Sequence, residues 1–479
     1  MIPLVLIVLG LATRFFDFGY PSQVVFDEVH SGNFISNYWH GTYFFDVHPP
    51  LAKLILLLFS HIVGAVPNVD FSTIGNALPH SYILMRILPS LLGSLIPVII
   101  YFISRRIGFS KIVSSMAGLF VVFENSLVLQ SRFVLFDTFL LFFGFTSLLV
   151  YMIYAQGVHK HSRKLSFLFI VLSAILASAA FGTKWTGLSF ALIIICLEFV
   201  RIFMHNQISF SVFRKNCSRK NWSEYILFKT IFIFVFLILY ISSFVIHFSL
   251  LPHSGPGDNY MSERFQNSLS GSKLPKPFAF VDGKLTQTNK MNSMEKTLEL
   301  NKVMIEANVN FGSTHPYSSK WYTWPLMLRS IYYWNSTSHY IYLIGNPFIY
   351  WAGIVSVLFL FLSFVFEFCK NIFSKKNPSE DYVNFPTIFI LLGFLANFLP
   401  FSFIGRVMFL YHYEPALIFS IMALAYLLNI MRNKKYFYPV IFVVIIVTIL
   451  LFLYFSPLTY GYNLNDSELF SRMWLPGWR

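Results

Sequence analysis

Charged residues are scarce in this chain. They make up 12% of its 479 residues, whereas 56% are hydrophobic and 19% are aromatic, and the mean hydropathy is +0.63. A soluble domain has a charged fraction of about 25%, because its surface must be solvated. The composition therefore excludes a soluble protein and predicts an all-α integral membrane protein.

Acidic residues and cysteines are also few. The chain has 21 Asp and Glu against 35 Lys and Arg, which gives a formal net charge of +14. The basic residues occur in short clusters between apolar runs rather than along one stripe, so we interpret them as topology signals and expect no nucleic-acid partner. Cys196, Cys217 and Cys369 lie far apart, so they form neither a disulfide framework nor a zinc site.

Long apolar runs fill most of the remaining chain. Residues 2–16 lack the basic start and the small-residue cleavage site of a signal peptide, so we expect an uncleaved first span. Residues 51–66 are apolar but short, and we expect an interfacial or re-entrant helix there. Further runs have about the length that crosses a core of roughly 30 Å. They cover residues 82–103, 112–129, 133–154, 165–181, 185–202, 227–250, 348–368, 385–403, 407–430 and 437–455. The prediction is about eleven transmembrane helices.

Basic clusters occur in alternate connections between these runs. They lie at residues 105–111, 160–164, 214–220, 370–376 and 432–435. The positive-inside rule then places the N-terminus in the cytoplasm. We expect an N-terminal membrane half (1–250) with a first outer loop (17–81), a long outer loop (251–346), C-terminal membrane helices (347–456) and an outer tail (457–479).

The first outer loop contains a dense polar island. Asp27, Glu28, His30, Asp46 and His48 lie within 22 residues of one another, between strongly apolar segments. Most acidic loops are simply solvated, but these carboxylates adjoin bulky apolar residues, and the island ends in a His-Pro-Pro turn that restricts the backbone. We interpret the island as a candidate active site. The adjacent acidic pair also leaves cation binding open, although we predict no metal site.

Basic residues are expected at the outer ends of several helices. Arg132, Lys184 and Arg406 would lie on the same side as the acidic pair. One such residue can simply extend to the membrane interface, but several beside a carboxylate pair indicate a bound anionic group such as a phosphate. A carboxylate base could then activate an acceptor hydroxyl for a single inverting displacement, with phosphate as the leaving group. Asp27 and Glu28 both fit this role, and one of them could instead hold the geometry of the other.

The long outer loop has two further features. Residues 294–308 have helical apolar spacing and predict a small amphipathic helix on the membrane. His315, Lys320, Trp321 and Trp324 crowd together in residues 314–326. Aromatic residues in such a position are more often interfacial anchors than ligand contacts.

Seven strings, taken in order, resemble one known family. They are VVFDEVH, TYFFDVHPPLAK, SRFVLFDTFL, GTKWTG, SGPGDNYMSERFQ, HPYSSKWYTWPL and RVMFLYHYEPAL. From about residue 14 to 415 the chain is similar to the protein O-mannosyltransferases, GT-C membrane enzymes of glycosyltransferase family 39. The resemblance implies the GT-C fold, a dolichyl- or polyprenyl-phosphate-mannose donor, and inverting transfer of mannose to Ser and Thr hydroxyls of proteins. It also implies contact with membrane lipids, allows a dimer, and requires no cofactor.

The resemblance also assigns roles to individual residues. Asp27 is the implied base, with Glu28 beside it. Arg132 is the better candidate for binding the donor phosphate, and Arg14 matches a second arginine of the family. His48 of the His-Pro-Pro turn is implied to shape the acceptor groove. Beside these, Lys184 and Arg406 are expected phosphate ligands from their placement, and His315 and Trp321 are expected acceptor or loop residues.

The chain departs from the family in its long outer loop. Eukaryotic members usually carry a β-trefoil MIR domain there, and residues 252–346 are too short to hold one. We therefore favour a bacterial plasma membrane, with the endoplasmic reticulum membrane as the location if the source is eukaryotic.

Other functions stay open to different degrees. A GT-C enzyme that transfers a lipid-linked sugar to a lipid or glycan acceptor would need the same base and phosphate ligands. A transporter is disfavoured because the charges gather at one interface and no repeated pair of broken helices is evident. A purely structural protein would leave the acidic island unexplained.

Overall fold

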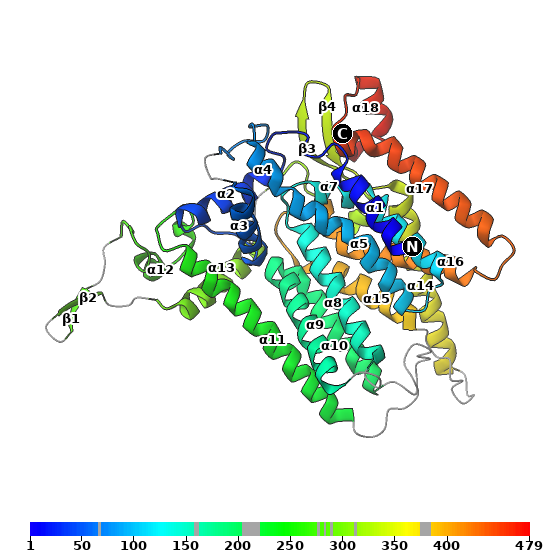
Figure 1. The fold of residues 1–479 in the computed structure, drawn as a ribbon, viewed down its shortest axis with the longest axis horizontal. Helices are drawn as coiled ribbons and strands as arrows, with labels where there is room; N and C mark the ends of the chain where they lie inside the picture. The colour runs from blue at the N-terminus through cyan, green and yellow to red at the C-terminus, as the bar shows by residue number, and fades with distance from the viewer. Residues whose placement is uncertain are drawn as a thin grey trace.

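The computed structural model describes residues 1–65, 69–157, 162–203, 221–274, 278–281, 284–287, 291–310, 314–373 and 385–479. The described part of the chain is mostly helical, with two short strand pairs (Figure 1). The predicted basic cluster at 214–220 lies outside the described residues, as do Lys160, Cys217 and residues 374–376.

The membrane helices follow the predicted apolar runs closely. Within the described residues, eight helices are long and apolar enough to cross a membrane, and a bent pair makes a ninth if it counts as one span. The protein is therefore a multi-pass membrane protein. The elements concerned are α4 (His80–Met85) with α5 (Ile87–Arg106), α8 (Asp137–Gly157), α9 (Arg163–Thr183), α11 (Asn221–Leu250), α14 (Pro347–Phe373), α15 (Phe385–Phe398) with η4 (Leu399–Phe403), η5 (Leu410–Tyr413) with α16 (Glu414–Ile430), and α17 (Phe437–Tyr460).

Two of the eleven predicted spans correspond to shorter helices. α1 (Ile2–Phe15) has 14 residues, and α10 (Leu188–Phe203), which follows the 3-10 turn η1 (Trp185–Gly187), has 16. A straight helix of 14 residues spans about 21 Å, less than the roughly 30 Å of a hydrocarbon core, and the described part of α10 ends at Phe203. Within the described residues the structure thus has a helix in every predicted span, and eight or nine of these spans are long enough to cross a membrane.

The span predicted over residues 112–129 is bent in the structure. This segment forms α6 (Lys111–Val122) and α7 (Asn125–Arg132), which meet at an angle of 56°. Glu124 causes the break, because its buried side chain accepts hydrogen bonds from Leu127 N at 2.8 Å and Asn346 N at 2.7 Å. A carboxylate that caps the start of a helix favours a new helix start over continuation of the preceding one.

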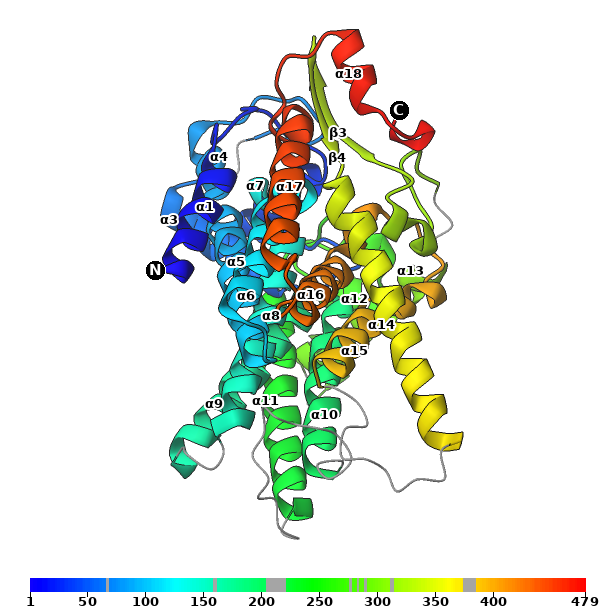
Figure 2. The same ribbon diagram turned by 90° about the vertical axis from the view of Figure 1, so that its right-hand side faces the viewer.

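Different elements lie at the two ends of the molecule. The free ends of α9, α10, α11 and α14 lie together at one end (Figure 2), and the antiparallel hairpin of β3 (Ile331–Ser336) and β4 (His339–Leu343) lies at the other beside α18 (Asp466–Arg472). Close helix packing depends locally on glycine. A Cβ atom added at Gly393 of α15 would lie 2.0 Å from the ring of Phe419 in α16.

Short helices surround the site at the hairpin end. The first outer loop forms α2 (Glu28–His40) and α3 (Leu51–Val63), and this confirms a short helix over the residues predicted to be interfacial or re-entrant. The long loop forms η2 (Asp258–Tyr260), α12 (Glu263–Asn267), the β1–β2 pair (Phe278–Val281 and Lys284–Gln287), α13 (Ser293–Asn310) and η3 (Trp321–Leu326).

The helix predicted over residues 294–308 is present as α13. Leu300 and Met304 are buried against the protein, whereas Leu298 is 66% exposed and Ile305 is 54% exposed. Its apolar residues therefore face two ways, and its contact with a membrane stays a prediction.

The tail packs back onto the hairpin end. Leu464 N donates to Ser338 O at 2.8 Å, and the buried Trp478 of η6 (Pro476–Trp478) donates through Nε1 to Met327 O at 2.5 Å. The four-part division of the chain stays a prediction.

Candidate functional site

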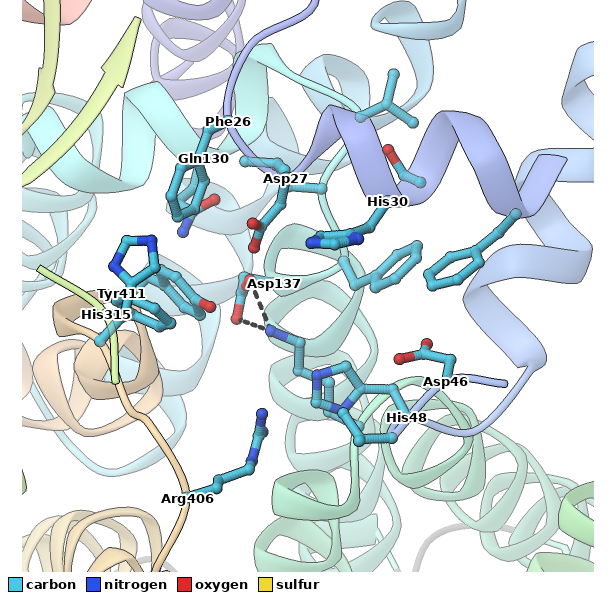
Figure 3. A pocket seen from close by; sticks show the side chains of 18 of the residues that line it. Phe26, Asp27, His30, Asp46, His48, Gln130, Asp137, His315, Arg406 and Tyr411 are labelled. Atoms are coloured by element: carbon cyan, nitrogen blue, oxygen red, sulfur yellow. Dashed lines mark hydrogen bonds and ion pairs between the residues drawn. The ribbon is translucent and has the colours of Figure 1, made fainter. Parts of the chain in front are cut away.

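The acidic island opens onto a cavity of about 470 Å³ (Figure 3). Its walls come from the start of α2, the loop before α3, the connection from α7 to α8, the end of α9 and the loop before α16. Five of the nine predicted site residues line it, namely Asp27, His48, Lys184, His315 and Arg406. Residues that are far apart in sequence thus meet at one site.

A strained bend positions Asp27. Phe26 has a φ of +45°, a conformation that is costly for a bulky residue and persists only where surrounding contacts hold it. The ring of Phe26 stacks on Tyr333 of the hairpin at 4.1 Å, and Phe26 N donates to Tyr333 O at 3.2 Å. Asp27 is the N-cap of α2, yet its side chain makes no capping hydrogen bond. The carboxylate therefore faces the cavity instead of the helix (Figure 3).

Glu28 faces the opposite way. It is fully buried, does not line the cavity, and accepts hydrogen bonds from Arg86 Nε at 2.9 Å and Arg86 Nη2 at 2.6 Å. Its two oxygens also accept from the backbone N–H groups of Val25 and Val134, each at 3.1 Å. The catalytic role expected for Glu28 does not fit this placement, because all of its acceptor capacity is used inside the protein. The geometry fits the alternative, in which Glu28 holds Asp27 in place.

Arg86 was missed in the sequence. It donates to the carbonyls of Gly19, Pro21 and Gln23 as well as to Glu28, so it fastens the whole segment that leads to Asp27. The available signal was a single basic residue inside the apolar run 82–103, and such a residue needs a partner when it is buried.

Lys184 enters the cavity already paired. Its Nζ lies 2.7 Å and 2.8 Å from the two carboxylate oxygens of Asp137 (Figure 3), and 5.0 Å from the centre of the Tyr411 ring. Asp137 thus offsets part of the positive charge of Lys184.

Arg406 is a different kind of cation. No described carboxylate lies within ion-pair distance of it, and its buried Nε has no hydrogen-bond partner among the described residues. A guanidinium in this state can receive an anion with two parallel hydrogen bonds.

Lys53 stabilises the His-Pro-Pro turn. Lys53 Nζ pairs with Asp46 and donates to His48 O at 2.8 Å. Burial lowers the pKa of the His48 imidazole well below its usual value, and the nearby charges of Lys184 and Arg406 lower it further. His48 is therefore neutral near pH 7 and can donate or accept a hydrogen bond in the cavity.

His315 and Trp321 differ in position. His315 lines the cavity, with its ring 5.0 Å from that of Phe409, and burial lowers the pKa of its imidazole. Trp321 lies outside the cavity lining and packs against Phe398 at 4.9 Å. An acceptor contact by Trp321 does not fit this placement, whereas a packing role does.

Arg132 and Arg14 do not line the cavity either. Arg132 donates to Arg14 O at 3.0 Å and to Asp17 O at 3.0 Å, and its guanidinium lies 4.7 Å from the centre of the Tyr460 ring. Arg14 donates to Val121 O at 3.0 Å and to a neighbouring carbonyl. Arg132 thus donates to backbone carbonyls at the end of α1, and Arg14 to carbonyls at the end of α6. The buried Nε of each has no partner among the described residues, but neither arginine lines the cavity, so the phosphate-binding role expected for them does not fit the structure.

Burial dominates the acid strength of Asp27. It raises the pKa of the carboxyl above its ordinary value, Asp137 and Asp46 raise it further, and the charges of His30 and Lys184 act the other way. Among the described residues no group of three His, Cys, Asp or Glu side chains could hold a metal ion.

The raised pKa of Asp27 predicts a cost in stability. The folded state binds this proton more tightly than the unfolded state, so stability falls as the pH rises from the ordinary Asp value toward the raised pKa, and then levels off. The side chain in Asp27→Asn cannot ionise, so we expect this variant to have a higher melting temperature than wild type at pH 7. The difference in melting temperature should shrink as the pH falls from the raised pKa of Asp27 toward the ordinary Asp value. Thermal unfolding in detergent measures both.

Asp70→Asn is the matched control. Hydrogen bonds from Ser72 lower the pKa of this exposed carboxyl, so its replacement should not stabilise the protein at pH 7. An Asp27→Asn protein that melts below wild type at pH 7 would contradict the proposed environment of Asp27.

Two family models match the chain, and both describe protein mannosyltransferases. The model described as "Dolichyl-phosphate-mannose-protein mannosyltransferase" matches residues 4–252, and the model for the "C-terminal four TMM region of protein-O-mannosyltransferase" matches residues 293–478. The first match alone covers more than half of the chain.

Similar individual proteins are longer. Dolichyl-phosphate-mannose–protein mannosyltransferase 1 of Candida albicans is 23% identical, over 95% of this chain and 75% of the relative. The enzyme of the same name from Saccharomyces cerevisiae is also 23% identical, over 97% of this chain and 81% of the relative.

A solved structure shares the fold. The S. cerevisiae protein O-mannosyltransferase Pmt1–Pmt2 complex bound to the sugar donor aligns with a TM-score of 0.89 and 22% identity, covering 100% of this chain and 92% of the compared chain. The fold of the chain described above is the GT-C fold.

Proposed function

Because the chain belongs to the dolichyl-phosphate-mannose–protein mannosyltransferase family, we propose that it transfers mannose from dolichyl- or polyprenyl-phosphate-mannose to Ser and Thr hydroxyls of proteins. One observation supports this reading most strongly. Arg406 and Asp27 line the same cavity, and neither forms an ion pair with another described residue. A phosphate ligand and a base are the two groups that this transfer needs.

In the proposed reaction Asp27 acts as the base. Its carboxylate takes the proton from the acceptor hydroxyl while the hydroxyl oxygen forms a bond to the anomeric carbon of mannose. The bond from that carbon to the phosphate oxygen breaks, and the electron pair leaves with the lipid phosphate. A single displacement of this kind inverts the configuration at the anomeric carbon.

Arg406 and Lys184 would stabilise the departing phosphate. Arg406 supplies a positive charge that no described carboxylate pairs with, and Lys184 supplies a second cation whose charge Asp137 partly balances. Because these cations neutralise the leaving phosphate, no separate general acid is required. We propose no cofactor for the reaction.

The acceptor and the compartment are also proposals. A GT-C enzyme with a lipid or glycan acceptor would use the same base, but the relatives are named as protein mannosyltransferases, which favours a protein acceptor. Both relatives named above are yeast enzymes and give no support to the expected bacterial plasma membrane, so we propose the endoplasmic reticulum membrane. The Pmt1–Pmt2 complex supports pairing with a second chain of the family.

The role of Asp27 can be measured by mannose transfer. Purified protein, synthetic dolichyl-phosphate-mannose and a Ser/Thr-rich peptide are the components. Asp27→Asn should lower kcat by at least about a hundredfold, the effect expected when a general base is removed. Asp466→Asn, at an exposed position on α18, should retain wild-type activity. Equal rates for wild type and Asp27→Asn would remove Asp27 from the mechanism.

The role of Arg406 can be measured through the donor. Arg406→Gln removes a charge-assisted contact to phosphate, so we expect kcat/KM for dolichyl-phosphate-mannose to fall by roughly 10- to 100-fold. Arg432→Gln, an exposed change in the connection between α16 and α17, is the control and should have no effect. An unchanged kcat/KM in Arg406→Gln would mean that Arg406 does not contact the phosphate.

A further inference from the structure

A second hollow adjoins the catalytic cavity. It has a volume of about 530 Å³ and lies between the segment 314–329 and the loop 404–408, and we call it the side groove. Its lining residues are Thr314, Ser318, Ser319, Lys320, Thr323, Leu328, Arg329, Ile404, Gly405, Arg406, Val407, Met408 and Gly477. Arg406 lines both hollows, so the side groove borders the place where the reaction is proposed to occur.

The side groove carries uncompensated positive charge. Lys320 and Arg329 are exposed on its wall, no Asp or Glu contributes to the lining, and neither cation forms an ion pair with another described residue. Arg329 is oriented by a hydrogen bond that its Nη2 donates to Pro316 O. An anionic group entering the groove would therefore meet two cations that no described carboxylate neutralises.

The walls of the side groove are tied together. Ser319 N donates to Met408 O at 2.9 Å and so joins the two segments directly. Trp324 Nε1 donates to Ser319 Oγ at 2.9 Å, and Thr323 Oγ1 donates to Lys320 O at 2.7 Å. The groove is thus formed before any ligand arrives, which lowers the entropic cost of binding.

The groove is better suited to a polypeptide than to a lipid chain. Its hydroxyl groups and cations would lose hydration against an isoprenoid tail without gaining partners. The backbone amides and polar side chains of a peptide can satisfy those groups, and a carboxylate can pair with the cations.

We propose that the side groove binds the stretch of acceptor polypeptide next to the modified Ser or Thr, and that an acidic side chain in this stretch pairs with Lys320 and Arg329. This inference rests on the proposed function and deepens it, because it gives the enzyme a preference among acceptor sequences. Arg406 then separates the donor phosphate on one side from the acceptor chain on the other.

The test compares acceptor peptides of one composition apart from charge. Each contains a single Thr, flanked by either Glu or Gln residues, and kcat and KM are measured for wild type in neutral detergent. We expect the Glu peptides to have a kcat/KM roughly fivefold higher, through KM, because exposed ion pairs are individually weak. The preference should shrink in high salt, which screens such pairs.

Substitutions in the side groove test whether it causes the preference for Glu peptides. The double variant Lys320→Gln/Arg329→Gln should lose the preference and use the Glu and Gln peptides with equal kcat/KM. Lys320→Arg/Arg329→Lys retains both charges and should retain the preference. Lys320→Glu/Arg329→Glu should reverse it toward peptides flanked by Lys. Lys302→Gln, an exposed lysine on α13 outside the groove, is the control and should behave as wild type.

The outcomes separate this inference from the proposed function. Equal use of Glu and Gln peptides by wild type, or a preference that survives in the double Gln variant, would overturn the inference while the transfer itself stands. The inference would also be overturned if wild type shows no peptide preference but needs anionic lipid in the micelle for activity, while the double Gln variant does not. That result would assign the groove to lipid headgroups. No transfer to any peptide would overturn both.

Discussion

The buried ion pair between Glu28 and Arg86 is the interaction on which the proposed active site depends. Each is almost completely inaccessible, and together they join the loop before α2 to the start of α5 and to the connection between α7 and α8. Removing one partner from such a pair typically costs about 3–5 kcal/mol, because the other charge is left buried and unpaired. Since this pair fixes the residue after Asp27 and the hairpin fixes the residue before it, the strained conformation at Phe26 persists and the carboxylate faces the cavity.

Most of the charged residues in and around the cavity form ion pairs. Asp46 is neutralised by Lys53, Lys184 by Asp137, and Glu28 by Arg86. Among the described residues Asp27 and Arg406 have no ion-pair partner, and the proposed transfer uses them as base and phosphate ligand, with Lys184 as a second cation. The neutral His48 adds a hydrogen-bonding group without adding charge. The paired groups thus hold the site together and leave the unpaired ones free for substrates.

Part of the fold and of the candidate site could be predicted from the sequence. Apolar runs of sufficient length located the membrane helices because a bilayer core permits little else, and the expected meeting of Asp27, Lys184 and Arg406 on one side agrees with the cavity. The roles of Glu28 and Arg132 could not be separated from those of Asp27 and Arg406. The sequence alone does not distinguish a carboxylate that forms an ion pair inside the protein from one that faces a cavity. The difference lies in contacts with residues far away in the sequence, 58 positions for Glu28 with Arg86 and more than a hundred for Arg132 with the end of α1.

The central claim is that Asp27, with its pKa raised by burial, is the base, and the pH dependence of acceptor kcat/KM tests it most directly. The account predicts that the rate rises with pH through one ionisation above the ordinary Asp value of 3.8, and that this rise is absent from the residual activity of Asp27→Asn. The same rise at the same pH in both proteins would contradict the account, because the ionisation would then belong to another group.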